Sequence, residues 1–379
     1  MFTVFLRRVR VTTKGCNLIY QQQFSENAVS TRSCSSSVCE NASQKSLVVS
    51  YLINTCGLSP DDAVSASKKM NNLCFKSPEN PDAVLKLLRA YGFTDAHHIP
   101  KIVTRWPDVL LASPSKTLFP KFEFLRSIGV RLPVLAHNLS IYPFMLRRSL
   151  KNWIIPLYND LKSLLGSDER VAHVFSRSPA GFMSFDVSIF RERGVPESSI
   201  ITLVMYQPAL LVYPKKKLSL FIDRAVAMGF DISKSAFVHA VRVFSGMSEL
   251  TLKRKMEVYR RCGCTESDIN IAFLRHPLCM SLSEKKITAN MDFLVNTLGY
   301  KPAVIAQHPV LLSLSLDKRI KSRCLVARAL NEKGLKKMPS MTTMLKMPEE
   351  KFLNQYIVKH EKDIPNLLDI YRGKSNRGP

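Results

Sequence analysis

One pattern of hydrophobic and polar positions returns along most of this 379-residue chain, with a period of roughly 34 residues. Each copy begins with a glycine and a polar residue that can cap a helix. It continues with apolar residues at helical spacing and then usually reaches an anchor, a proline followed by large apolar residues. The anchors are Trp106-Pro107, Tyr142-Pro143, Ser178-Pro179, Gln207-Pro208, His276-Pro277 and His308-Pro309, while Phe244-Ser245-Gly246-Met247 holds the same place without proline. This self-similarity predicts a solenoid of stacked units that share one continuous core.

Within each copy the local signals are helical. Residues 265–268 form a capping-box pattern, and the glycine just before them can end the preceding helix. The anchor proline lacks a backbone donor and disfavours a helical residue before it, so it separates a short first helix from a longer second one, such as 118–127 or 218–228. No strand-like alternation competes over any length. The sequence therefore predicts an all-α, helical-repeat solenoid of seven or eight units, with Gly57 and Ser77-Pro78 as a degenerate early copy.

The first 45 residues differ in composition from the repeats. Arg7, Arg8 and Arg10 lie among apolar residues, the stretch is serine-rich, and its only acids are Glu26 and Glu40. This composition is typical of an organellar transit peptide, and such early arginines favour the mitochondrion over the chloroplast. A secretory signal is the alternative, but the apolar run is short and interrupted by arginines. We expect a disordered transit peptide at 1–45, repeats at 46–330, and a C-terminal helical cap with a basic tail at 331–379.

Composition and motifs disfavour membrane and enzyme classes. There is no run of 18 uncharged apolar residues, so we expect no membrane span. Phosphate-loop, dinucleotide-binding and zinc-protease motifs are absent, and acids fall mainly at helix starts, where capping explains them. We therefore expect no enzyme, no catalytic residue and no cofactor.

One cluster could hold a metal: Cys262, Cys264, His276 and Cys279 lie within 18 residues. The repeat frame explains it more simply, because His276 takes the slot before the anchor proline and Cys279 an apolar slot after it. We expect no metal site. Nine scattered cysteines in a reducing organelle also predict no disulfides.

Charge indicates the partner class most strongly. Lys plus Arg number 55 against 30 Asp plus Glu, a formal net charge of +25, and about +21 remains without the six bases and two acids of residues 1–45. A field of that sign concentrates polyanions, above all nucleic acid. The bases also return at a nearly constant distance after each anchor. The recurring set is Lys116, Arg147, Arg148, Lys151, Lys215, Lys216, Lys217, Lys253, Arg254, Lys255, Lys285, Lys286, Lys318, Arg319, Lys321 and Arg323.

Equal offsets in a solenoid map to one side of the stack, so these residues predict a basic stripe that binds nucleic acid. The alternative is a solvated start of each second helix. Cations there oppose the helix macrodipole, at a cost of about 0.3–1 kcal/mol each, so stability alone would favour acids. A row of phosphates suits helix N-termini, where backbone donors already favour anions.

The repeat, with its glycine, capped helix and x-Pro-x-Leu-Leu anchor, resembles that of the mitochondrial transcription termination factor family, mTERF. The segments 329–335, 344–347, 351–353 and 371–373 are similar to the C-terminal end of plant members, and the resemblance covers essentially residues 47–373. It implies two α-helices and a short 3-10 turn per unit, wound into a curved superhelix with a basic concave groove. It also implies binding of organellar double-stranded DNA with effects on transcription termination or initiation, or, as in some plant members, action on organellar RNA including intron splicing. The missing proline at Ser245 and a 29-residue third interval between anchors depart from the pattern.

Three functions stay open at this point. The favoured one is binding of double-stranded DNA that regulates organellar transcription, in which lysines hold phosphates and arginines read bases; the candidates for base readout are Arg147, Arg148, Arg254, Arg319 and Arg323. Binding of RNA for splicing or processing needs aromatic rings beside the bases, for which the candidates are Phe119, Tyr142, Trp153, Tyr213, Phe221 and Tyr259. A protein scaffold would use the same groove for an acidic partner. We expect a monomer, with organellar DNA or RNA and other organellar gene-expression proteins as partners.

Overall fold

Nine pairs of helices form the repeats in the part of the chain that the structure describes. The computed structural model describes residues 42–70, 77–335 and 340–373, and within those ranges it contains no strand. Residues 1–41 of the predicted transit peptide lie outside the described residues, and α2 (Ala42–Asn54) is the first described helix. The predicted all-α repeat architecture is confirmed.

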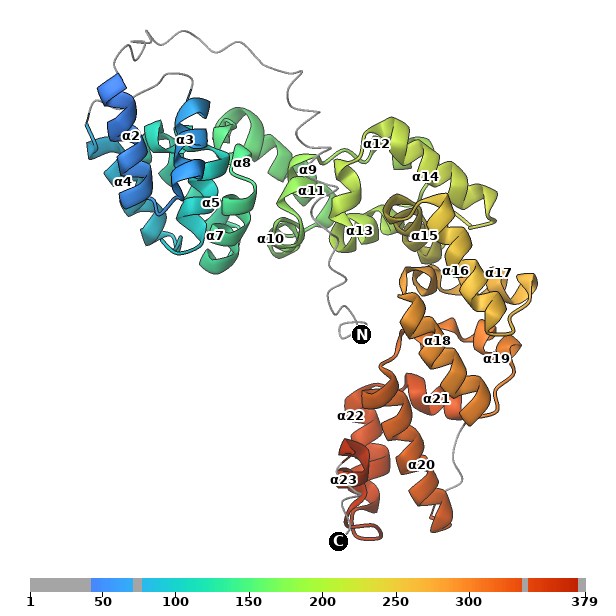
Figure 1. The fold of residues 1–379 in the computed structure, drawn as a ribbon. Helices are drawn as coiled ribbons and strands as arrows, with labels where there is room; N and C mark the ends of the chain where they lie inside the picture. The colour runs from blue at the N-terminus through green and yellow to red at the C-terminus, as the bar shows by residue number, and fades with distance from the viewer. Residues whose placement is uncertain (1–41, 71–76, 336–339, 374–379) are drawn as a thin grey trace. The chain divides into compact units, whose positions relative to one another are not determined.

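The first helices of the pairs are α3 (Pro60–Lys69), α5 (His98–Arg105), α7 (Leu132–Ile141), α10 (Asp168–Arg177), α13 (Glu197–Tyr206), α15 (Ser235–Gly246), α17 (Glu266–Arg275), α19 (Pro302–Gln307) and α21 (Met341–Lys346). The second helices are α4 (Glu79–Ala90), η2 with α6 (Pro114–Leu118, Phe119–Ser127), η3 with α9 (Leu150–Ile154, Ile155–Leu165), α12 (Ser188–Glu192), α14 (Lys215–Ala227), α16 (Glu249–Arg261), α18 with η6 (Glu284–Asp292, Phe293–Thr297), η8 with α20 (Leu316–Lys321, Ser322–Glu332), and α22 with η9 (Glu349–Phe352, Leu353–Ile357). The chain continues with η10 (Val358–His360) and α23 (Leu367–Arg372). Figure 1 shows the α-helices along the chain.

In six pairs the anchor proline opens or directly precedes a short helical turn between the two helices. These turns are η1 (Pro107–Leu111), α8 (Phe144–Arg147), α11 (Pro179–Met183), η4 (Pro208–Val212), η5 (Pro277–Ser281) and η7 (Pro309–Ser313). Proline is well placed there, because the first residues of a helix have no intrahelical acceptor for their N–H groups. The predicted division of each unit into helix, proline break and second helix is confirmed.

Three places differ from the regular unit, each for a local reason. Without its proline, α15 runs through Gly246, and Ser248 caps α16 directly. The 29-residue interval is accommodated by a short second helix, α12. The segment predicted as a cap after residue 330 contains a ninth pair, which the sequence pattern hid because Pro348 stands immediately before α22 with no separate turn.

The backbone conformation between pairs requires glycine. The glycines that begin the repeats have positive φ, from +72° at Gly194 and Gly299 to +95° at Gly129; they are Gly92, Gly129, Gly166, Gly194, Gly229, Gly263 and Gly299. Only glycine enters this left-handed region without a penalty from Cβ, which is why it follows the second helix at these seven places.

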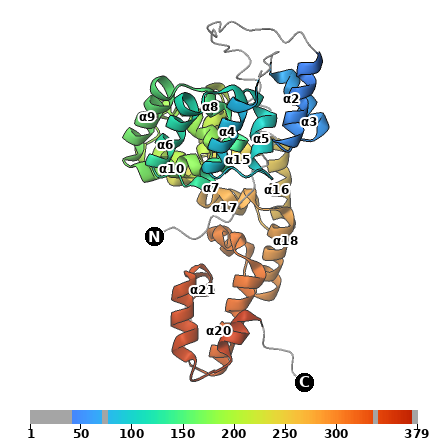
Figure 2. The ribbon, with the colours of Figure 1, turned by 90° about the vertical axis from the view of Figure 1, so that its left-hand side faces the viewer.

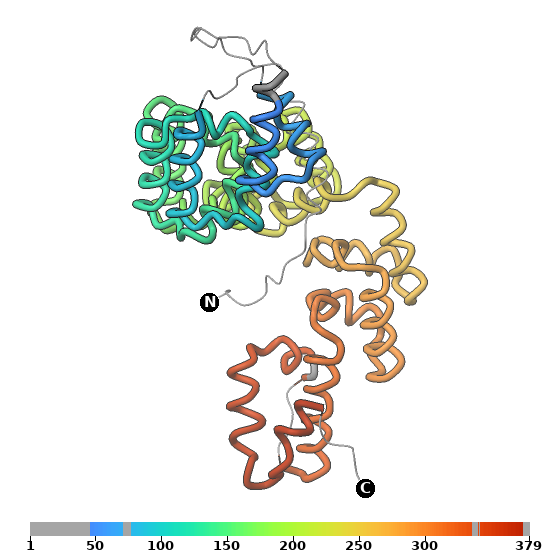
Figure 3. Tube along the Cα trace, turned by 60° about the vertical axis from the view of Figure 1, so that its left-hand side comes forward, coloured from blue at the N-terminus to red at the C-terminus, as the bar shows by residue number. Residues whose placement is uncertain are grey.

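The chain divides into two compact units, Met1–Ser219 and Leu220–Pro379, with the boundary inside α14. Within each unit neighbouring pairs pack in chain order, as the colours in Figure 3 show: α5 contacts α7 and α10 contacts α13 in the first unit, and α17 contacts α19 in the second. In the second unit α20 lies beside α23 and α21 (Figures 1 and 2). Among the described residues no helix is both long and apolar enough to cross a membrane.

Arginines at the ends of first helices join successive pairs. Arg105, the last residue of α5, donates from Nη1 to the carbonyl oxygen of Ile141, the last residue of α7. Arg177 donates in the same way to Tyr206 at 3.1 Å, and Arg275 to Gln307 at 3.1 Å. The last carbonyls of a helix have no intrahelical partner, so each arginine satisfies one of them in the next pair. The sequence pattern did not predict these hydrogen bonds.

At Gly181 two successive turns of the stack approach each other too closely for any side chain. A Cβ at Gly181, in α11, would overlap the carbonyl oxygen of Pro208 in η4, the equivalent turn of the next pair. This close approach explains why Gly181 follows an anchor where other copies carry bulky residues.

We expect Gly181→Ala to reduce the free energy of unfolding by about 1–3 kcal/mol, because α11 and η4 must separate to admit the methyl group. Gly246→Ala is the control, since no atom lies within 4 Å of a Cβ there. Urea denaturation followed by circular dichroism measures both. Equal midpoints for the two variants would contradict the close approach.

Candidate nucleic-acid interface

A serine cap places the recurring lysines at the start of the second helices. The side-chain oxygens of Ser113, Ser283 and Ser315 accept the backbone N–H of the residue three positions later at 3.2–3.4 Å, and that residue is a lysine each time: Lys116, Lys286 and Lys318. Ser149 and Ser248 cap their helices in the same way. The serine could have been read from the sequence, since a cap of this kind is preferred at helix starts.

The predicted bases differ in their exposure. Ten are exposed: Lys116, Arg147, Lys151, Lys215, Lys216, Lys217, Lys253, Arg254, Lys285 and Lys318. Arg148, Lys255, Lys286 and Lys321 are half-buried, and Arg319 and Arg323 are buried. The exposed set, together with Arg148, Lys286 and Lys321, is called the helix-start cations below.

Two half-buried lysines direct their ammonium groups to the next pair. Lys255 Nζ donates to the carbonyl oxygen of Leu282, and Lys286 Nζ donates to that of Ser313 at 2.7 Å. Desolvation lowers the pKa of both lysines, as burial does for any cation. Lys255 therefore serves mainly the packing of the stack, whereas Lys286 also stands at the helix start.

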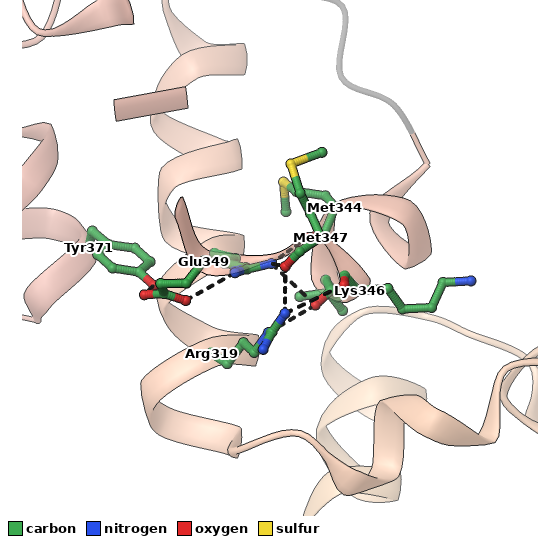
Figure 4. A network of polar contacts seen from close by, with 8 residues as sticks. Arg319, Met344, Lys346, Met347, Glu349 and Tyr371 are labelled. Atoms are coloured by element: carbon green, nitrogen blue, oxygen red, sulfur yellow. Dashed lines mark hydrogen bonds and ion pairs between the residues drawn. The ribbon is translucent and has the colours of Figure 1, made fainter. Parts of the chain in front are cut away.

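The structure corrects the prediction for Arg319 and Arg323, which are buried in the second unit. Figure 4 shows Arg319 beside Lys346 and Met347. Arg319 donates from Nε to the carbonyl oxygen of Leu345 at 3.1 Å and from Nη2 to that of Met347. Arg323 is fully buried, donates to Met344 at 2.8 Å and Met347 at 2.6 Å, and pairs with Glu349 at 3.1 Å. Buried guanidinium groups with these partners have no surface for nucleic acid. Sequence could not reveal this, because the acceptors belong to the ninth pair.

Three helix-start cations pair with nearby acids. The distances are 3.2 Å for Lys215 with Asp186, 3.0 Å for Lys253 with Glu249, and 2.9 Å for Lys321 with Asp317. Exposed pairs of this kind are weak, so a phosphate can replace the carboxylate.

The cations of the second and third pairs, in the first unit, gather around a depression of about 460 Å³. Its lining includes Lys116, Lys121, Arg147, Arg148 and Lys151. Lys116, Lys121 and Lys151 form no ion pair with any residue that the structure describes. Lys121 was not predicted; it is only 4% exposed, and its Nζ donates to the carbonyl oxygen of Leu146. Four predicted bases are therefore brought together around a buried fifth.

The aromatic candidates for base stacking also differ in their exposure. Tyr259 is buried and donates to the carbonyl oxygen of Cys279 at 3.1 Å, so it cannot stack on a base. Phe119 is 46% exposed, three residues after Lys116. Trp153 is half-buried, with the guanidinium carbon of Arg148 5.4 Å from its ring centroid.

The cysteine and histidine cluster has ordinary structural partners. His276 Nε2 lies 3.2 Å from Ser313 Oγ, and Cys279 is buried in η5. Within the described ranges no three His, Cys, Asp or Glu side chains are grouped as a metal ion would require.

We expect Arg323→Met to destabilise the second unit by at least about 2 kcal/mol, because several buried carbonyl groups and Glu349 lose their donor. Arg328→Met, on the exposed side of α20, is the matched control and should stay within about 0.5 kcal/mol of the wild type. Urea denaturation and the rate of proteolysis near residue 340 measure the effect. A loss of nucleic-acid affinity with unchanged stability would contradict a purely structural role.

Comparison with known proteins shows the family of this chain. The family model described as mTERF matches residues 85–184 and 161–353, more than two thirds of the chain. The chain is also similar to the protein named transcription termination factor MTERF8, chloroplastic, from Arabidopsis thaliana, at 21% identity over 264 residues, which is 67% of this chain. The match spans about half of that relative's length, 51%. On the family match, this chain belongs to the mTERF family, whose members are not enzymes.

Proposed function

We propose that this chain binds organellar double-stranded DNA through its helix-start cations and regulates organellar transcription, at termination or initiation. The observation that carries the proposal is the recurrence of lysines three residues after the serine caps of second helices, at the helix end whose dipole favours anions. Phosphate contacts of this kind provide affinity and orientation. The family membership and the printed name of the relative support the same class of function.

Base readout, in this proposal, falls to exposed or half-exposed arginines among the helix-start cations. Arg147, Arg148 and Arg254 remain as candidates for base readout, because Arg319 and Arg323 are buried. Arginine can pair with guanine in a bidentate way in the major groove.

Binding of RNA is the second candidate, and one observation favours it. Trp153 and the exposed Phe119 lie close in sequence to the cations that line the depression. Aromatic rings beside cations are typical of sites for unpaired bases. A preference of the full chain for single-stranded RNA over a duplex of the same sequence would favour this function over the first.

For localisation we propose an organelle, with the early arginines favouring the mitochondrion and the name of the relative favouring the chloroplast. Imaging of a fluorescent fusion of the full chain decides between the two. A diffuse cytosolic signal would contradict import into either organelle.

We expect the triple variant Lys216→Gln/Lys217→Gln/Lys318→Gln to weaken duplex binding and to reduce the slope of log K against log salt by about 0.9 for each phosphate that the variant no longer neutralises. The matched control, Lys333→Gln/Lys359→Gln/Lys362→Gln, removes three exposed lysines outside the helix starts, and its affinity should stay within about twofold of the wild type. Fluorescence anisotropy across a salt series measures both. Equal losses of affinity in the two variants would show that only net charge matters and would contradict the proposal.

A further inference from the structure

Lys121 is a buried cation that, among the described residues, lacks the ion pair that Arg323 makes at the equivalent place in the stack. It lies eight residues after the cap Ser113, and Arg323 lies eight residues after the cap Ser315. Both side chains donate to carbonyl oxygens of the next pair. Arg323 also meets Glu349, the first residue of the next second helix. The position of Glu349 corresponds to Leu150 in the pair that follows Lys121.

Another second helix also begins with an acid near a cation of the preceding pair. Lys255 lies seven residues after the cap Ser248, and the charge of Glu284, the first residue of the next second helix, opposes the desolvation that lowers the pKa of Lys255. An acid at the first helical position is also favoured by the helix dipole. Leu150, at the same helix start as Glu349, is apolar, and it lines the depression.

The charged groups that line the depression beside Lys121 are all positive, so an anion is favoured there. Lys116 comes from η2, Arg147 and Arg148 from the α8 region, and Lys151 from η3, and no carboxylate lines the depression. Asp108 in η1 influences Arg147 from outside this lining. Burial lowers the pKa of Lys121 to about 8, as expected for a cation removed from water without a compensating charge.

From this we infer that the depression lined by Lys116, Lys121, Arg147, Arg148 and Lys151 is a phosphate-binding subsite, where the bound nucleic acid supplies the charge that Glu349 and Glu284 supply elsewhere. The inference rests on the proposed function, and it names one place where a backbone phosphate is held. The expected ligand is a phosphate group next to the desolvated ammonium of Lys121. Desolvation strengthens the charge-assisted hydrogen bonds between the two groups.

The decisive variant gives the depression an internal acid at the position that Glu349 holds in the last pair. We expect Leu150→Glu to keep or raise the melting temperature and to weaken binding of a 30-base-pair DNA duplex about tenfold, with a salt slope lower by about 0.9. Leu150→Gln is the matched neutral control, and Leu325→Glu adds the same charge on an exposed face of α20. Both controls should bind within about twofold of the wild type. Equal affinity of Leu150→Glu and Leu150→Gln would overturn the inference, as would an equal loss in Leu325→Glu.

A second measurement uses inorganic phosphate and separates failure of the subsite from failure of the proposed function. Phosphate should raise the melting temperature of the wild type and of Leu150→Gln above that in chloride of equal ionic strength, and should not raise that of Leu150→Glu. If the wild type binds no duplex but shows this phosphate effect, the proposed function fails and the subsite stands. If duplex binding follows the helix-start cations but Leu150→Glu changes neither measurement, the subsite fails and the proposed function stands.

Phosphate binding should also depend on pH in a stated direction. A bound phosphate favours the charged form of Lys121, so binding is strongest below a pH of about 8 and weakens as the pH rises through the pKa of Lys121 in the free protein. Titration calorimetry with inorganic phosphate between pH 7 and pH 9 measures this trend, with Lys121→Met as the variant that should lose it. The same decline in Lys121→Met would assign the titration to another group and contradict the role of Lys121.

Discussion

Helix ends leave carbonyl groups without partners, and basic side chains of the preceding pair satisfy many of them. A solenoid of short helices has many such ends, and burying them without donors would be costly. Arg105, Arg177 and Arg275 serve the ends of first helices. Lys121, Lys255, Lys286, Arg319 and Arg323 serve the turns and helix ends that follow. The stack is therefore joined by cations as well as by its apolar core.

These hydrogen bonds change what the net charge implies about nucleic-acid binding. Part of the excess of 55 bases over 30 acids is held inside the stack by neutral carbonyl oxygens, which do not need a matching acid. Other bases are exposed or half-buried, and the helix-start cations are a subset of them. Net charge alone thus overstates the number of cations that can meet nucleic acid, while the position of each base in the repeat separates the two roles. Lys121 and Lys286 combine the two roles, because each donates to a carbonyl oxygen and lies at or beside a helix start.

The fold was largely predictable from the sequence because its determinants are local. A glycine ends each second helix through its positive φ, and proline starts the anchor turn without needing a donor, so both signals act within a few residues. The ninth pair escaped detection because Met347-Pro348 leads directly into α22. The site was less predictable. The acceptors of Arg319 and Arg323 lie 21–28 residues further along the chain, and the correspondence of Leu150 with Glu349 appears only when the helix starts of the structure are aligned. The arginine before three of the anchors was a visible signal that the pattern of large apolar residues obscured.

If the proposed function is right, the position of a base in the repeat decides whether it binds nucleic acid. Lysine-specific labelling of the full chain, followed by mass spectrometry with and without a DNA duplex, measures this for each lysine. We expect DNA to protect Lys116, Lys151, Lys216, Lys217 and Lys318, and to leave Lys333, Lys359 and Lys362 as reactive as in the free protein. Protection spread evenly over all exposed lysines, or confined to those outside the helix starts, would contradict it.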